Sequence, residues 1–131
     1  MISFIDNFEK IIGESLTNKL RELGLIQIQP LAFVRGRSID NTIIIIDEAQ
    51  NISIQNMRTL MTRIGDNSKM VILGDIKQKD IKNPKNSSLE VVIDKFEGID
   101  GFGCVSLRNP DDVVRNPVIK IIEKVFEELE G

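Results

Sequence analysis

The chain contains no histidine, tryptophan or tyrosine, and Cys104 is its only cysteine. Without histidine or a cysteine cluster, this chain cannot by itself build a zinc site or a histidine-based catalytic triad. A single cysteine also excludes an internal disulfide. Because the only aromatic residues are six phenylalanines, we do not expect a platform on which nucleic-acid bases stack.

A strong charge of either sign is also missing. The formal net charge of −3 gives no ground for inferring affinity for nucleic acid or for an anionic membrane. Asp6 and Glu9 stand where a signal peptide would be positively charged, and no apolar run reaches the length of a membrane span. We therefore expect a cytoplasmic protein that does not contact membranes. The composition, rich in isoleucine and asparagine, is typical of a low-GC bacterium or its phage.

The 131 residues suffice for one small domain with a core, and neither a linker nor a repeat divides them. Apolar spacing predicts helices and short strands in alternation. Strands are expected at residues 25–31, 42–47, 69–73 and 102–107, and helices at residues 4–22, 54–64, 87–96 and 117–129. This order predicts an α/β fold with a mostly parallel three- or four-stranded sheet and flanking helices, in which residues 43–47 are fully buried.

Local signals mark where three of these helices begin. Ser53 is expected to cap one helix, and Ser87 with Glu90 has the spacing of a capping box. Asn116 followed by Pro117 is typical of a helix start, because proline is favoured at the first helical position.

Two adjacent acids, Asp47 and Glu48, follow the strand IIII of residues 43–46. At the carboxyl end of a parallel strand, the first acid can hold Mg²⁺ through water and the second can polarise a water molecule for attack on a phosphate. The alternative is that two acids simply end a strand and begin a loop.

A second polar segment, Gly74-Asp75-Ile76-Lys77-Gln78, closes the next strand. Gly74 would allow close approach to a ligand, and the Gln78 amide would report a γ-phosphate. Taken alone, the segment is also compatible with an ordinary surface loop. Because neighbouring parallel strands end at one edge of a sheet, we expect Asp47 and Asp75 to lie near each other.

Several blocks, in this order, resemble the PhoH-like family of P-loop ATPases, which are relatives of superfamily 1 helicases. The blocks are PLAFVRGR at residues 30–37, DEAQN at 47–51, MRTLMTRIG at 57–65, GDIKQKD at 74–80 and DVVRNP at 112–117. The resemblance implies a partial P-loop NTPase fold of the RecA and helicase type. It divides the chain into an N-terminal helix at residues 1–24 and a Walker B-containing core at residues 25–131.

The resemblance also implies roles for individual residues. Glu48, Gln78 and Arg115 would be catalytic, Asp47, Asp75, Arg35 and Arg37 would bind nucleotide, and Asp47 would hold Mg²⁺ through water. For the three arginines, simpler interpretations remain open: Arg115 pairs with a neighbouring acid, and Arg35 and Arg37 are solvated turn residues. The family histidine is Asn116 here, so any role of that imidazole is lost.

The phosphate loop, G-x-x-x-x-G-K-[ST], is absent from the sequence, and none of its nine glycines precedes a lysine. In the family this loop lies upstream, so we expect the chain to be the C-terminal portion of such a domain. ATP and Mg²⁺ would then bind only with a partner: an upstream polypeptide carrying the loop, or a homo-oligomer.

Two alternatives to this split ATPase remain open. One is a non-enzymatic module that binds protein or nucleic acid, and the other is an incomplete gene product. RNA or DNA is a further candidate partner. Lys77, Lys79, Lys82 and Lys85 form either a nucleic-acid contact or a solvated loop.

Overall fold

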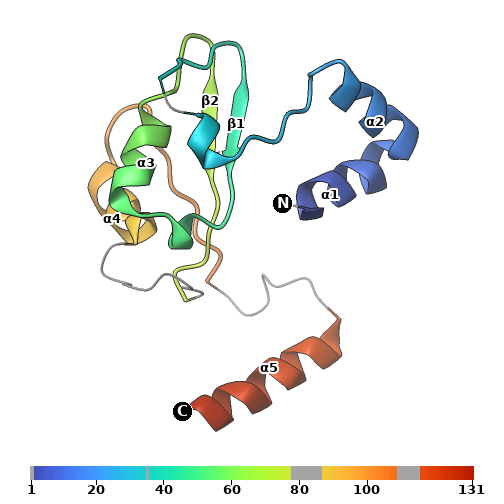
Figure 1. The fold of residues 1–131 in the computed structure, drawn as a ribbon. Helices are drawn as coiled ribbons and strands as arrows, with labels where there is room; N and C mark the ends of the chain where they lie inside the picture. The colour runs from blue at the N-terminus through green and yellow to red at the C-terminus, as the bar shows by residue number, and fades with distance from the viewer. Residues whose placement is uncertain (1, 35, 78–86, 109–115) are drawn as a thin grey trace. The chain divides into compact units, whose positions relative to one another are not determined.

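The computed structural model describes residues 2–34, 36–77, 87–108 and 116–131 (Figure 1). The chain divides into two compact units, Met1–Glu97 and Gly98–Gly131. The first unit holds the sheet and helices α1 to α4, and the second holds helix α5.

The expected N-terminal helix is in fact two helices, α1 (Ile2–Ile12) and α2 (Glu14–Glu22). They meet at Gly13, whose φ of 87° and ψ of 156° lie in a region that residues with a side chain rarely adopt. The hydroxyl of Thr17 donates to the Gly13 carbonyl at 2.8 Å. The apolar spacing continues across Gly13, which is why the sequence pattern predicted a single helix.

Two parallel strands form the sheet, β1 (Ile43–Ile46) and β2 (Lys69–Ile72). Their register pairs Ile43 with Lys69 and Ile46 with Ile72. Helix α3 (Ile54–Met61) lies in the connection between the strands, and helix α4 (Ser88–Phe96) follows β2 in the chain (Figure 1). The α/β class and the parallel pairing are therefore confirmed.

The expected strands at residues 25–31 and 102–107 are wrong. The first segment has no regular structure before a short 3₁₀ helix at Leu31–Phe33, and the second is irregular throughout. Pro30 lacks an N–H for a sheet ladder, and Val105 and Leu107 are 90% and 78% exposed. Among the described residues the sheet has two strands, so a sheet of three or four strands is not shown.

A small core lies on one face of the sheet. Its buried residues are Ile46 from β1, Met57 and Leu60 from α3, Leu89 from α4, and Ala49. Successive side chains of a strand point to opposite faces of the sheet, so every second side chain of β1 faces this layer. Helices α3 and α4 supply the layer.

On the other face of the sheet, apolar side chains of the described residues are left exposed. Ile43 and Ile45 are 69% and 44% exposed, and on β2 Val71 is 43% exposed. The expectation that residues 43–47 are fully buried is therefore wrong. A run of four isoleucines is typical of a strand buried on both faces, whereas helices α3 and α4 supply core residues on only one.

All three expected helix starts are confirmed, and the expected capping bond forms at two of them. The Ser53 hydroxyl accepts from Asn56 N at 3.2 Å, and the Asn116 side chain accepts from Val118 N at 3.1 Å at the start of α5 (Pro117–Glu130). Ser87 precedes α4, but its side chain makes no capping hydrogen bond there. Among the described residues, no helix combines the length and the hydropathy that a bilayer crossing requires.

Candidate functional site at the carboxyl ends of the strands

The carboxyl ends of β1 and β2 lie side by side. Beyond the paired strands, Leu73 N donates to the Ile46 carbonyl at 2.8 Å, and Ala49 N donates to the Leu73 carbonyl at 2.9 Å. These bonds carry the parallel pairing past the last strand residues. Asp47, which follows β1, and Asp75, which follows β2, therefore lie at the same edge of the sheet, as the sequence predicted.

Glu48 adopts a left-handed backbone conformation, with φ 53° and ψ 39°. Its N–H donates to Asp47 Oδ1 at 2.9 Å, and a short 3₁₀ helix (Ala49–Asn51) begins directly after it. For a residue with a side chain this conformation costs roughly 1–2 kcal/mol, so it persists only where the surroundings hold it. The other described non-glycine residues with positive φ are Asn41 and Asn67, a residue type that tolerates it.

Gln50 connects the two strand ends. It is only 1% exposed, and its Nε2 donates to Glu48 Oε2 at 2.6 Å. Its Oε1 accepts from Asp75 N at 3.0 Å, and its backbone carbonyl accepts from the Ser87 hydroxyl at 2.9 Å. One buried side chain thus contacts both acidic segments, and Ser87 bonds to Gln50 instead of capping its own helix.

Gly74 has a packing role in this arrangement. A Cβ atom at Gly74 would lie 2.7 Å from Gln50 Oε1, 2.7 Å from Leu89 Cδ2 and 3.2 Å from Ala49 N. The missing side chain therefore leaves room for the Gln50 amide, which the sequence did not predict. Close approach of a ligand to Gly74 stays a prediction.

The remaining predicted site residues are only partly described. Asp75 is exposed, and its Oδ1 accepts from Lys77 N at 2.9 Å. Arg37 is exposed. Arg35, Gln78 and Arg115 lie outside the described residues, as do Lys79, Lys82 and Lys85.

The chemistry of the strand ends suits one kind of cation site. Among the described residues, no three acidic or cysteine side chains form a group that would hold a metal by themselves. Mg²⁺ is usually bound by one or two carboxylates together with water and substrate phosphates. The half-buried Asp47 fits that shared mode rather than a cage built from protein ligands alone.

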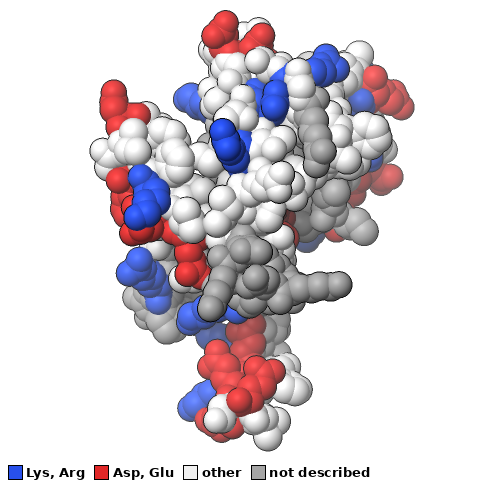
Figure 2. Space-filling view, turned by 60° about the vertical axis from the view of Figure 1, so that its left-hand side comes forward, with Lys and Arg blue, Asp and Glu red and all other residues white. Residues whose placement is uncertain are grey.

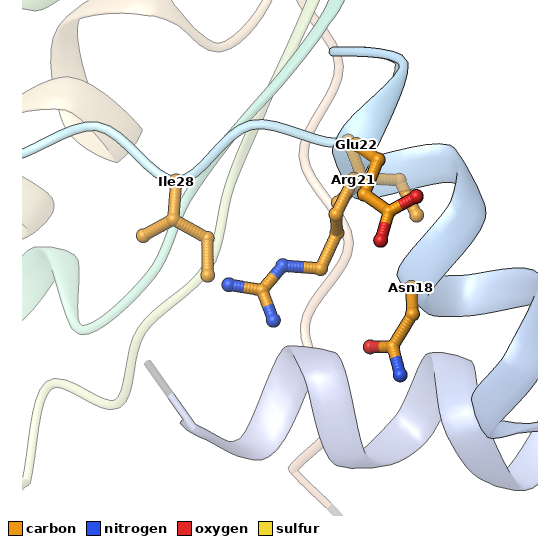
Figure 3. Close-up of a pocket in the computed structure, with 5 residues that line it drawn as sticks. Asn18, Arg21, Glu22 and Ile28 are labelled. Carbon is orange, nitrogen blue, oxygen red and sulfur yellow. The ribbon is translucent and has the colours of Figure 1, made fainter.

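Two shallow hollows lie away from this edge. One, of about 460 Å³, is lined by Asn18, Arg21, Glu22, Ile26 and Ile28, and Arg21 extends into it between Asn18 and Ile28 (Figure 3). The other, of about 550 Å³, lies beside the start of α3 and is lined by Ser53, Ile54, Gln55 and Arg58. Neither is lined by a residue of the strand ends.

Acidic and basic side chains are interspersed on the face drawn in Figure 2, with uncharged residues between them. This distribution agrees with the small net charge of −3. RNA or DNA as a partner therefore rests on the family resemblance and not on charge.

The α/β fold with acidic residues at adjoining strand ends defines a class of candidate nucleotide site, and comparison with known proteins identifies the family. The family model described as "PhoH-like protein" matches residues 1–127. The PhoH-like protein of Bacillus subtilis is 42% identical over 119 residues, and that of Synechocystis is 39% identical over 112 residues. These matches cover 90% and 86% of this chain. Protein PhoH of Escherichia coli is 36% identical over 92 residues, 70% of this chain and 26% of its own length.

The chain belongs to the PhoH-like family. It spans 37% of the length of the Bacillus subtilis relative and 34% of that from Synechocystis, about a third of each.

Proposed function

We propose that this chain supplies the Walker B half of an ATP-binding and ATP-hydrolysing site, which a segment carrying the phosphate loop completes. The observation that supports this most directly is the meeting of two acidic strand ends, Asp47–Glu48 and Asp75, at one edge of a parallel sheet. Open α/β sheets bind ligands at this edge. In the proposal, Asp47 binds Mg²⁺ through water and Glu48 orients and polarises the attacking water. Bound Mg²⁺ would neutralise charge on the phosphates.

The other residues in the proposal rest on the family resemblance. Gln78 and Arg115 complete the catalytic set, and Arg35 and Arg37 contact the nucleotide together with Asp75. Gln78 would report the γ-phosphate and Arg115 would stabilise its charge. RNA or DNA as the partner whose binding is coupled to hydrolysis, and a cytoplasmic location, are part of the same proposal.

The second half of the site has to come from elsewhere, because these 131 residues contain no phosphate loop. Backbone amides and a lysine of that loop normally provide most of the grip on β- and γ-phosphates. The uncovered sheet face, with Ile43 and Ile45 exposed, favours a segment that adds strands and a covering layer. That addition would enlarge the two-stranded sheet of this chain.

The test combines this chain with a polypeptide segment that carries the phosphate loop G-x-x-x-x-G-K-[ST]. The segment is supplied both as a separate polypeptide and as a fusion, so that weak association does not hide activity. Fluorescent-nucleotide titration measures binding, and phosphate release measures turnover. We expect neither activity from the chain alone and both from the completed protein.

Three variants assign the roles within the completed protein. Asp47→Ala should weaken Mg²⁺-dependent ATP binding, and Glu48→Gln should leave ATP bound while slowing hydrolysis on the order of a hundredfold. Asp94→Asn, which removes an exposed acid on α4, serves as the matched control. A soluble, fully assembled protein that binds no nucleotide would refute the proposal.

The uncovered apolar face also favours a second candidate, a non-enzymatic module that binds another protein there. This alternative predicts partner binding without ATP, and binding that Asp47→Ala and Glu48→Gln leave unchanged.

A further inference from the structure

The Gln50 side chain has a fixed orientation. Its amide nitrogen donates to Glu48 Oε2 at 2.6 Å, and its amide oxygen accepts from Asp75 N at 3.0 Å. Turning the amide over would place its oxygen against a carboxylate and its NH₂ group against an N–H donor. Because the side chain is only 1% exposed, water cannot replace the lost bonds without opening the core.

The Gln50 backbone is fixed as well. Its carbonyl accepts from the Ser87 hydroxyl at 2.9 Å, and Ser87 is itself 3% exposed. Ala49, the preceding residue, is fully buried in the core and donates its N–H to the Leu73 carbonyl at 2.9 Å. The Gln50 side chain therefore bonds to both strand ends, while its backbone bonds to Ser87 at the start of α4.

The Glu48 carboxylate is free to change direction unless a neighbouring residue holds it. Its backbone is left-handed, and the residue is exposed. Of the bonds described above, only the one from Gln50 reaches its carboxylate. A carboxylate that must point at a reacting water needs a defined direction, and the hydrogen bond from Gln50 defines one.

We propose that Gln50 is a positioning residue, which holds the Glu48 carboxylate in its working direction and couples that direction to the Gly74–Asp75 turn. This inference rests on the proposed function, in which Glu48 acts on water. Gln50 is not a catalytic residue in this scheme, because it acts through Glu48. A movement of the Asp75 backbone would reach Glu48 through the Gln50 amide.

Two substitutions separate the two bonds of the amide. Gln50→Leu removes both, whereas Gln50→Glu keeps an acceptor for Asp75 N but replaces the donor that faces Glu48 with a second carboxylate. Gln55→Leu, at an exposed glutamine on α3, is the matched control.

The first measurement is amide hydrogen exchange at Asp75 in the isolated chain, which requires no nucleotide. We expect slow exchange in the wild type, in Gln50→Glu and in Gln55→Leu. Gln50→Leu should speed exchange at Asp75 while the amides of β1 stay protected. Unchanged protection at Asp75 in Gln50→Leu would overturn the coupling.

The second measurement is steady-state hydrolysis by the completed protein, normalised to the number of nucleotide-binding sites. We expect Gln50→Leu and Gln50→Glu to lower kcat by roughly tenfold to a hundredfold, the scale for a misplaced catalytic group, with KM for ATP changed less than about threefold. Normalisation removes the effect of any unfolded fraction, so a merely structural role would leave kcat per site unchanged.

A double variant tests whether Gln50 acts through Glu48. In a Glu48→Gln background, Gln50→Leu should slow hydrolysis no further, because the carboxylate that it positions is already gone. Independent, multiplicative slowing would overturn the inference, and so would a wild-type kcat in Gln50→Leu. A completed wild-type protein that does not hydrolyse ATP refutes the proposed function and removes the catalytic part of this inference. The exchange result still decides the structural part.

Discussion

Gly65→Ala should destabilise this fold through a collision away from the strand ends. A Cβ atom at Gly65 would overlap the Asp40 carboxylate oxygen Oδ1 and lie 2.8 Å from the Ile39 carbonyl oxygen. That carboxylate oxygen accepts from Asp66 N at 2.8 Å. The Ile39 carbonyl accepts from Gly65 N at 2.9 Å and from the Ser68 hydroxyl at 2.8 Å.

The magnitude follows from what has to move. If Asp40 swings away, the bond to Asp66 is lost, which costs about 1 kcal/mol. The Ile39 backbone must also shift, and forcing an extra carbon into a packed site costs about 1–3 kcal/mol. The alanine makes the unfolded chain less flexible, which offsets about 0.4–1 kcal/mol. The net loss of unfolding free energy should be about 1–3 kcal/mol, close to 1 M in the urea midpoint at a slope of about 1–3 kcal/mol per M.

The assay is urea unfolding monitored by circular dichroism, and Gly103→Ala is the control. A Cβ atom at Gly103 would meet no atom within 4 Å, so its midpoint should stay the same or rise slightly. Adding Asp40→Ala to Gly65→Ala should cost less than the sum of the two single changes, since it removes one collision. A Gly65→Ala midpoint equal to that of the wild type would refute the reasoning.

Three further outcomes are expected, and the same unfolding assay measures the stability change in each. Met57→Ala should lower the free energy of unfolding by about 2–5 kcal/mol, because the side chain is only 1% exposed in a small core. The control Ile54→Ala, at an exposed isoleucine on the same helix, should lower it far less. Ser53→Ala should cost about 1 kcal/mol by removing the cap of α3, and Ser53→Asp should retain most of the stability. Replacing Ile43 and Ile45 together by threonine should leave the stability of the isolated chain nearly unchanged, but should prevent assembly with the phosphate-loop segment, as measured by size-exclusion chromatography.

The meeting of Asp47 and Asp75 could be predicted because it depends only on chain order and on a general property of parallel sheets. The alternation of helices and short apolar strands, and the caps at Ser53 and Asn116, were equally accessible, since each rests on local spacing. The failures at residues 25–31 and 102–107 have a different cause. A short apolar segment becomes a strand only beside a partner, and spacing alone does not reveal whether a partner exists.

The connecting role of Gln50 could not be predicted from spacing. Its bond to Glu48 depends on a left-handed residue, and its bond to Asp75 joins positions 25 residues apart. Ser87 illustrates the same limit, because its capping-box spacing was correct as a pattern while its hydroxyl bonds to the Gln50 carbonyl, 37 residues away. Gly74 did indicate close packing in the sequence, since a glycine at a strand end is typical of a turn or of a close approach by other atoms. Here the approaching atoms belong to the protein itself.

The electrostatics of the strand ends explain why this half of a site would depend on a second half. Three acidic residues, Asp47, Glu48 and Asp75, follow the two strand ends, and a nucleotide triphosphate is itself an anion. Like charges repel, so these acids do not by themselves favour a phosphate at this edge. A phosphate loop adds a lysine and a row of N–H donors, and a bound divalent cation adds two positive charges. In the proposed function, Asp47 would then act as a Mg²⁺ ligand through water and Glu48 as a proton acceptor, which requires Glu48 to be held in place beforehand. Gln50, which is buried within this chain and donates to the Glu48 carboxylate, is suited to hold Glu48 in that position before the other half arrives.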